Sequence, residues 1–265
     1  HGLVAFSPAQ VAAIRMLVAF LTLFPFVIGN IKKIPAHRWK YIIAAGLLGN
    51  GIPAILFTTA ETGLSSSVTG VLNALTPIFV LVVGLLFFKL KTTATGTFGI
   101  ILGFAGAVLM MVYNAQGGFD NNYYYGLIVI LACILYAFDT FILNNYLSDL
   151  NPVDVAGFAL FLIGPIAAAY LFSTDFTHRL AHTHGAWFSL FCAATLGMFG
   201  TAIAQALFNK MLKISSPLYS ASVTYVIPVV AIIWGLADGE KLGFIQVIGF
   251  IAVLAGVFLI NNRKA

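Results

Sequence analysis

Residues 41–88 decide the fold class of this chain, and they have the sequence YIIAAGLLGNGIPAILFTTAETGLSSSVTGVLNALTPIFVLVVGLLFF. Glu61 is the only Asp, Glu, Lys or Arg residue in this stretch. A helix needs about 20 predominantly apolar residues to cross a hydrocarbon core of about 30 Å. The stretch therefore predicts two membrane-spanning helices, over 41–60 and 62–88, that meet near Glu61.

The whole chain, like this stretch, is rich in apolar residues and poor in charged ones. Of the 265 residues, 61% are hydrophobic and 8% are charged, whereas an ordinary soluble domain has about 45–50% apolar and about 25% charged residues. The mean hydropathy is +1.02. This composition excludes a soluble globular protein, and it makes the positions of the charges more informative than the net charge of +5. No nucleic-acid partner is expected.

The same criterion predicts an all-α polytopic membrane protein with nine visible transmembrane helices. Six runs contain no Asp, Glu, Lys or Arg, and they are 41–60, 62–88, 92–119, 155–174, 214–237 and 242–262. Three further spans follow when one charge or a histidine-bearing flank is allowed, and they are 8–29 with Arg15, 124–147 with Asp139, and 187–209. The connectors are too short to hold a soluble domain, so one compact membrane domain is expected.

The basic residues predict the orientation of these helices. Cytoplasmic loops carry an excess of Lys and Arg. If the loop 30–40 is cytoplasmic, strict alternation places ten of the thirteen basic residues on that side: Lys32, Lys33, Arg38, Lys40, Lys89, Lys91, Lys210, Lys213, Arg263 and Lys264. Only Arg179 and Lys241 fall on the opposite side. This distribution predicts an inner-membrane or plasma-membrane protein with the visible N-terminus outside.

An internal repeat relates the two halves of the chain. The sequence GLLG at 46–49 matches GMFG at 197–200, an offset of 151 residues. The same offset pairs Phe57 with Phe208, Ser65 with Ser216, Pro77 with Pro228, and Gly84 with Gly235. Because the helices 41–60 and 187–209 run in opposite directions, the repeat is inverted, as in many secondary transporters.

The repeat predicts that one helix is missing from the visible chain. The second half has a helix at 124–147, and the first half has no counterpart to it. We expect a first repeat over 1–116, lacking its first helix, and a second over 117–265. A ten-helix, five-plus-five inverted arrangement follows, and a true nine-helix protein is the alternative.

Both halves carry a recurring set of residues. The first has Ser7-Pro8, Arg15, a small-residue run from Ala60 to Pro77, and Gly99 to Gly106, and the second has Ser216 to Pro228, Gly235, Glu240 and Gly249 to Gly256. In their order and duplication they resemble the EamA-type transporters of the drug/metabolite transporter superfamily. Lys89 stands where the second repeat has Glu240, a departure at a helix end.

The resemblance implies a multi-pass membrane protein that exports or exchanges small metabolites, frequently amino acids, through a central cavity. Alternating access of the two inverted halves is the expected mechanism. A small-molecule substrate and membrane lipid are the expected partners, with a coupling proton or other ion and with a monomer or a homodimer as open points. No cofactor is expected.

Polar and small residues on one helix face predict a wall of that cavity. On the helix ending at 88, Gly70, Asn73, Ala74 and Pro77 are spaced i, i+3, i+4 and i+7, which is one face of a helix. Their repeat partners are Ala221, Thr224, Tyr225 and Pro228. Small residues leave room, and a proline frees a carbonyl group. We therefore expect Asn73, Thr224 and Tyr225 to bind substrate and Pro77 and Pro228 to act as hinges, with close helix packing as the alternative.

Further polar residues lie inside other spans. Asn50 and Gln205 are one turn apart in the aligned register, and an unpaired amide in lipid is costly, so both are expected to point inward. Asp139 is one of two charged residues within spans, and Tyr136 precedes it by three residues on the same face. We expect Asp139 to bind a substrate amine or a proton, with an interfacial carboxylate near the cytoplasmic mouth as the alternative.

Two other function classes compete with a transporter. A membrane enzyme needs an acid, base or metal constellation, and His178 and His182, although spaced i, i+4, fall in an expected solvated outer loop with no acidic partners. No metal site is therefore predicted. A channel commonly uses a polar loop at membrane depth, and the sequence shows none. Recordings of unitary currents distinguish a channel from a transporter.

Overall fold

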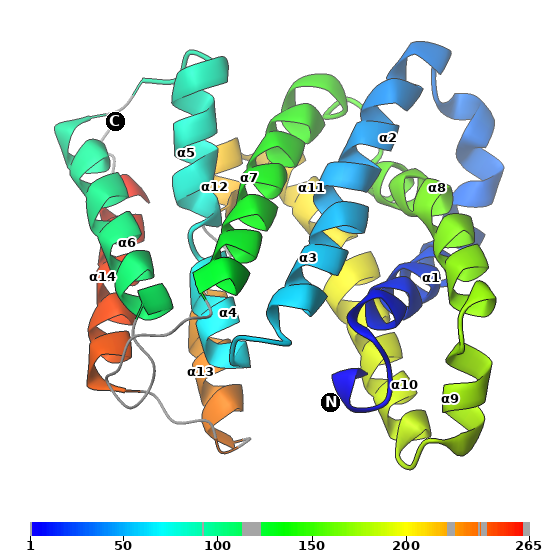
Figure 1. The fold of residues 1–265 in the computed structure, drawn as a ribbon. Coiled ribbons are helices and arrows are strands. Elements are labelled where there is room, and N and C mark those ends of the chain that lie inside the picture. The colour runs from blue at the N-terminus through cyan, green and yellow to red at the C-terminus, as the bar shows by residue number, and fades with distance from the viewer. Residues whose placement is uncertain are drawn as a thin grey trace. The chain divides into compact units, whose positions relative to one another are not determined.

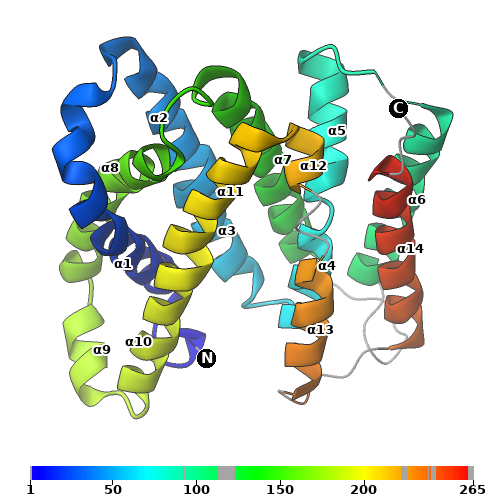
Figure 2. The same ribbon diagram turned by 180° about the vertical axis from the view of Figure 1, so that it is seen from behind.

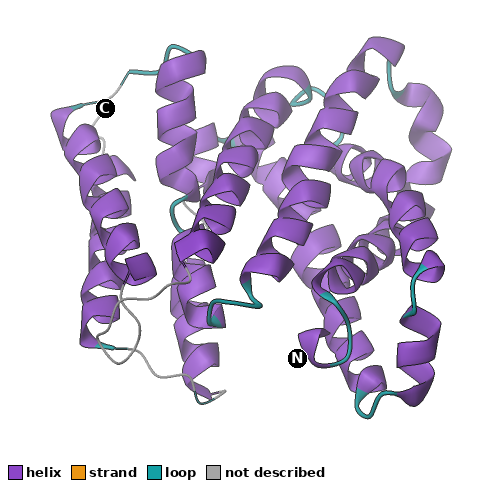
Figure 3. Cartoon of the chain, viewed as in Figure 1, coloured by secondary structure: helices purple, strands orange, loops and turns teal. Residues whose placement is uncertain are grey.

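A computed structural model describes residues 2–91, 93–112, 123–221, 226–237, 239 and 243–261. Every regular element in these ranges is a helix (Figure 3). Six helical segments are long and apolar enough to cross a membrane, and they cover 8–33, 36–60, 66–87, 123–146, 152–173 and 186–214. Shorter apolar helices cover 94–109 and 247–259. The predicted all-α multi-pass membrane protein is thereby confirmed, while the count of nine and the missing helix remain predictions.

The chain forms two compact units, each built from both halves of the sequence. The first contains 1–58 and 139–216, and the second contains 59–138 and 217–265. α3 (Ile52–Ala60) and α7 (Tyr123–Tyr146) contribute residues to both units. The repeat boundary expected at 116–117 lies outside the described residues.

In the first unit, the helix α1 packs along α8 (Figure 1). The elements of this unit, besides its parts of α3 and α7, are η1 (Gly2–Val4), α1 (Pro8–Val27), η2 (Ile28–Lys33), η3 (Ala36–Arg38), α2 (Trp39–Gly46), the π-helical η4 (Leu47–Gly51), α8 (Pro152–Ser173), α9 (Phe176–His182), α10 (Ala186–Thr195), the π-helical η5 (Leu196–Ile203) and α11 (Ala204–Ile214). A Cβ atom at Gly164 would lie 2.7 Å from Phe20 Cδ1. Glycine at this position of α8 therefore permits the close approach of α1.

In the second unit, α6 (Ala94–Val112) and α14 (Phe244–Asn261) lie side by side (Figure 1, Figure 2). The other elements are α4 (Ser66–Asn73), α5 (Thr76–Phe87), α12 (Pro217–Ala221) and α13 (Val226–Ala237). A Cβ atom at Gly106 would lie 2.5 Å from the Gly249 carbonyl oxygen, and one at Gly256 would lie 2.5 Å from that of Gly99. Small residues that let two backbones approach are a common basis of helix packing in lipid.

Three segments differ from their predicted bounds. The span expected at 155–174 begins at Pro152, because Asn151 caps the helix by accepting a hydrogen bond from the Val153 N–H. The span expected at 187–209 extends to Ile214. His178 and His182 lie in the short helix α9 rather than in a loop, so the prediction of a loop there is wrong, although both side chains are exposed as expected.

Candidate functional site

The helical segment 66–87 is interrupted where the sequence places Asn73 and Pro77. α4 ends at Asn73, and the N–H groups of Ala74 and Leu75 donate to carbonyl groups only three residues back, each over 3.0 Å. α5 then begins at Thr76, with Pro77 in its first turn. The span predicted over 62–88 is thus interrupted just before Pro77, because proline has no N–H to continue the helical hydrogen bonds.

A side chain compensates for the hydrogen bond that Pro77 cannot make. The Thr76 hydroxyl donates to the Asn73 carbonyl oxygen at 2.8 Å, and it lies 3.3 Å from Asn73 Oδ1. Thr76 is buried and Asn73 is half-buried. The break therefore gathers a backbone carbonyl, a hydroxyl and an amide at one point.

The helix α7 covers this break with a cysteine. Cys133 is fully buried, and its Sγ lies 3.6 Å from the Leu72 carbonyl oxygen and 3.9 Å from Asn73 Oδ1. Of the predicted hinge and cavity residues, the structure thus brings Asn73 and Pro77 together at the break. Thr224 and Tyr225, the predicted counterparts of Asn73 and Ala74, lie outside the described residues.

A second polar group lies in the first unit, at the π-helical segment η4. Asp139 is 3% exposed and Asn50 is 4% exposed. A Cβ atom on Gly49 would lie 2.6 Å from Asp139 Cγ and 3.0 Å from its Oδ1. Asp139 Oδ1 and Asn50 Nδ2 are buried, and neither has a hydrogen-bond partner among the described residues. Asp139 of α7 and Asn50 of η4 were predicted separately. Both are buried, and Asp139 lies against Gly49, the residue that precedes Asn50.

The second π-helical segment, η5, lies at the matching position of the predicted repeat. An offset of 151 residues carries η4 onto 198–202, which lie within η5. At η5 the Arg15 guanidinium donates to the Thr201 hydroxyl over 3.5 Å, and a Cβ atom on Gly197 would lie 2.7 Å from the Arg15 carbonyl oxygen. Each charged residue predicted within a span thus lies beside a π-helical segment. Such segments occur frequently at functional sites.

Sequence reasoning found the glycine pairs GLLG and GMFG but not the π-helical geometry. A π turn inserts one extra residue into a helix, and residue types alone do not encode that insertion. The glycines next to the charged residues were the available signal, since Gly49 and Gly197 are the positions that approach Asp139 and Arg15.

Three other predicted residues are Gln205, Tyr136 and Pro228. Gln205 is half-buried and donates to Asn209 Oδ1 over 3.4 Å, and Asn209 donates to the Pro152 carbonyl oxygen over 3.3 Å. Tyr136 is half-buried, three residues before Asp139 on α7. Pro228 lies in α13, and its side chain is outside the described part of the chain.

An open groove lies at the cytoplasmic end predicted for α8 and α11. Its volume is about 490 Å³, and it is lined by Asn151, Pro152, Val153, Ala206, Leu207, Lys210, Lys213 and Ile214. None of the predicted site residues lines it. Its lining is mainly apolar.

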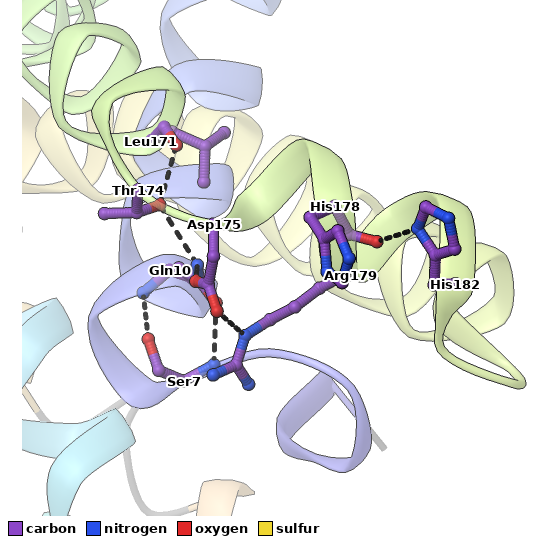
Figure 4. A network of polar contacts seen from close by, with 8 residues as sticks. All are labelled: Ser7, Gln10, Leu171, Thr174, Asp175, His178, Arg179 and His182. Atoms are coloured by element: carbon purple, nitrogen blue, oxygen red, sulfur yellow. Dashed lines mark hydrogen bonds and ion pairs between the residues drawn. The ribbon is translucent and has the colours of Figure 1, made fainter.

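A polar network joins the N-terminal end of α1 to the connection between α8 and α9 (Figure 4). Gln10 donates to Thr174 Oγ1 at 3.0 Å and to Asp175 Oδ1 at 2.8 Å. The hydrogen bond from Arg179 to Asp175, 2.6 Å long, lowers the pKa of the Asp175 carboxyl below its ordinary value. The His178 and His182 rings stack 4.4 Å apart on the same helix. No group of three or more His, Cys, Asp or Glu side chains able to hold a metal occurs among the described residues.

Comparisons with known proteins cover nearly the whole chain. The sequence profile of the EamA-like transporter family matches residues 1–112 and 124–262. An "uncharacterized transporter" of Archaeoglobus fulgidus is 27% identical over 259 residues, which are 97% of this chain and 90% of the relative. The "uncharacterized inner membrane transporter YedA" of Escherichia coli K12 is 25% identical over 272 residues, which are 99% of this chain and 84% of the relative.

The fold also has a counterpart among solved structures. One crystal structure aligns with 98% of this chain and 89% of its own, with a TM-score of 0.66 and 17% sequence identity. At this identity the likeness concerns the fold.

Proposed function

Because this chain belongs to the EamA-like transporter family, we propose that it is a secondary transporter that exports or exchanges small metabolites, amino acids included, by alternating access. Inverted-repeat transporters commonly bind substrate near the bilayer midplane, at helices whose regular hydrogen bonding is broken. The substrate class proposed here follows the tendency of the family.

The observation that carries the proposal is the helix break at Asn73–Thr76. Irregular backbone is tolerated at membrane depth only where it is buried in protein or lines a cavity. The break presents the Asn73 amide, which both donates and accepts hydrogen bonds, close to the Thr76 hydroxyl. A small metabolite with amine and carboxylate groups offers a matching set of donors and acceptors.

An enzyme and a channel are less well supported. An enzyme needs reacting groups that converge, whereas Arg15 and Asp139 lie beside different π-helical segments, η5 and η4. A channel is distinguished by experiment, because a transporter reconstituted in planar bilayers shows no unitary currents.

The test begins with a thermal-stability screen of the purified protein in detergent against amino acids, nucleosides and cationic drugs. A compound at 100 times its dissociation constant stabilises a protein by about 2.7 kcal/mol. A stabilising compound is then used in radiolabelled counterflow with proteoliposomes. Counterflow without unitary currents supports a transporter, and unitary currents contradict it.

A matched pair of variants then tests the helix break. Asn73→Ala is expected to lower the rate of substrate exchange about fivefold or more, because one lost hydrogen bond to substrate is worth about 1 kcal/mol or more. Asn145→Ala makes the same change at an exposed position of α7, and exchange should be unchanged. Equal exchange in both variants, at equal protein content, would remove Asn73 from the site.

A further inference from the structure

Asp139 is a buried carboxylate for which the described part of the chain offers no compensating partner. Its side chain lies against the Gly49 backbone of η4, where a Cβ atom would lie 3.0 Å from Oδ1, and Oδ1 has no hydrogen-bond donor among the described residues. A buried charge persists only if it is paired, hydrogen-bonded or neutralised by binding a proton. Inside a membrane span, an ionisable residue without such compensation indicates a functional site.

The charged groups on the elements that pack around this part of α7 are engaged elsewhere. Leu143 and Leu147 of α7 pack with α1, α2, α8 and α11 in one core cluster. On α1, the Arg15 guanidinium donates to the Thr201 hydroxyl over 3.5 Å. On α2, Lys40 lies 4.9 Å from the centre of the Tyr41 ring, and on α8, Asp154 accepts a hydrogen bond from Asn30 over 2.9 Å.

The basic groups at the ends of these helices are likewise accounted for. Arg38 pairs with Asp149 at 3.1 Å and also donates to the Tyr146 carbonyl oxygen. On α11, Lys213 donates to the Leu150 carbonyl oxygen over 3.0 Å, and Lys210 is exposed at the groove. The ring of Tyr41 stacks on that of Tyr146 at 4.1 Å, and His37 is exposed. The segment η4 itself, Leu47–Gly51, contains no titratable side chain.

From this arrangement we propose that Asp139 is the proton-binding site of the transporter, with its carboxyl group against the Gly49 face of η4. The proton binds to a carboxylate oxygen of Asp139 and is released from it, with no other bond made or broken. A proton needs no further room, and the contact with Gly49 covers one side of the carboxyl group, where a larger cation would need space. Resting on the proposed function, the inference adds that substrate leaves the cell in exchange for a proton that enters through Asp139.

The first experiment detects the proton without any substrate. Infrared spectra of the protein in lipid nanodiscs, in sodium-free buffer, report the carbonyl stretch of a protonated carboxyl group. We expect this band at neutral pH in the unmodified protein and its loss in Asp139→Asn. The matched control is Asp154→Asn, which removes a buried carboxylate that already has a donor, Asn30, and it should keep the band.

Several outcomes of this experiment would overturn the inference. They are a missing band in the unmodified protein, a band that persists in Asp139→Asn, and a band that appears only when sodium is withheld and disappears on its addition. If Asp139→Asn does not fold, Asp139→Glu should shift the band to the position of a glutamic acid, and an unshifted band counts against the proposal.

The second experiment measures coupling in proteoliposomes that contain a pH-sensitive dye and the stabilising compound from the screen. An inward proton gradient should drive efflux of that compound, and the protons that enter in exchange should acidify the interior. We expect this acidification with the unmodified protein and with Asp154→Asn, and not with Asp139→Asn. Efflux that proceeds without acidification in the unmodified protein contradicts proton exchange while leaving transport intact. If no compound is transported and the infrared band is present, the transporter proposal fails and the proton site stands.

Discussion

Gln10 and Asp175 lie 165 positions apart in the sequence, and the Gln10 side chain donates to Asp175 Oδ1 over 2.8 Å (Figure 4). Gln10 is 1% exposed, and its Oε1 also accepts a hydrogen bond from the Ser7 N–H, so the same side chain caps α1. One buried amide therefore joins the start of α1 to the start of α9.

Substitution of Gln10 should destabilise the first unit. Gln10→Ala removes the donor to Asp175 and the acceptor for Ser7, and losing a buried hydrogen-bonded group costs about 1–3 kcal/mol. We expect a lower Tm in detergent than for Asn145→Ala, which alters an exposed amide. Equal Tm values for the two variants would show that this network contributes little.

The Asp175 carboxyl should make stability depend on pH. The hydrogen bond from Arg179 lowers its folded pKa below the ordinary value, so its stabilising contribution is complete above the ordinary pKa and is lost as the pH falls through the lowered one. The Tm of the unmodified protein should exceed that of Asp175→Asn near pH 6, and this difference should shrink toward pH 3. A difference that is constant over this range would mean that the ionised form of Asp175 is not what stabilises the fold.

The contact between α6 and α14 should tolerate no side chain at its glycines. A Cβ atom at Gly106 would lie 2.5 Å from the Gly249 carbonyl oxygen and 2.8 Å from the Val253 nitrogen. These are backbone atoms, so Gly106→Ala forces the helices apart, and overpacking typically costs about 1–3 kcal/mol. Gly29→Ala is the control, because a Cβ atom there meets nothing within 4 Å. The Tm should fall for Gly106→Ala and not for Gly29→Ala.

The sequence predicts the helical membrane fold well because hydropathy and charge report directly on contact with lipid. The predicted ends of the helices are wrong where a helix contains charged residues. Asp154 lies in the first turn of α8 and is buried, since Asn30 donates to it, yet a criterion that excludes acidic residues places the start of the span after it. Lys210 and Lys213 had the same effect at the end of α11, where Lys213 reaches a backbone carbonyl group.

The candidate site was predictable only in part. The i, i+3, i+4, i+7 pattern found Asn73 and Pro77, but it assumed a regular helix. The N–H groups of Ala74 and Leu75 instead donate to carbonyl groups only three residues back, close to a proline that has no N–H. Gln205, expected to point inward like Asn50, donates to a neighbouring buried amide, Asn209. The sequence shows which polar residues are spaced i, i+4 on one helix, as Gln205 and Asn209 are. It does not show which of its possible hydrogen-bond partners a side chain contacts.

The helix break should depend on the Thr76 hydroxyl. In Thr76→Val the Asn73 carbonyl loses the donor at 2.8 Å and keeps the Cys133 thiol, whose Sγ lies 3.9 Å away. Loss of one such hydrogen bond costs about 0.5–1.5 kcal/mol. Thr76→Ser keeps the hydroxyl and should retain the Tm and the counterflow of the unmodified protein. Thr76→Val should lower both. If the serine variant fails as the valine variant does, the methyl group of Thr76 and not its hydroxyl maintains the break.

The basic residues should fix the orientation of the chain in the membrane. Lys33 and His184 are exposed, and the excess of Lys and Arg predicts that the first is cytoplasmic and the second is external. In a variant with Cys133 and Cys192 replaced by Ala, Lys33→Cys should react with a membrane-impermeant maleimide only in inside-out vesicles. His184→Cys should react only in intact cells or right-side-out vesicles. The reverse pattern would invert the topology and place the Lys210 and Lys213 groove at the outer face, where the charge rule does not put it.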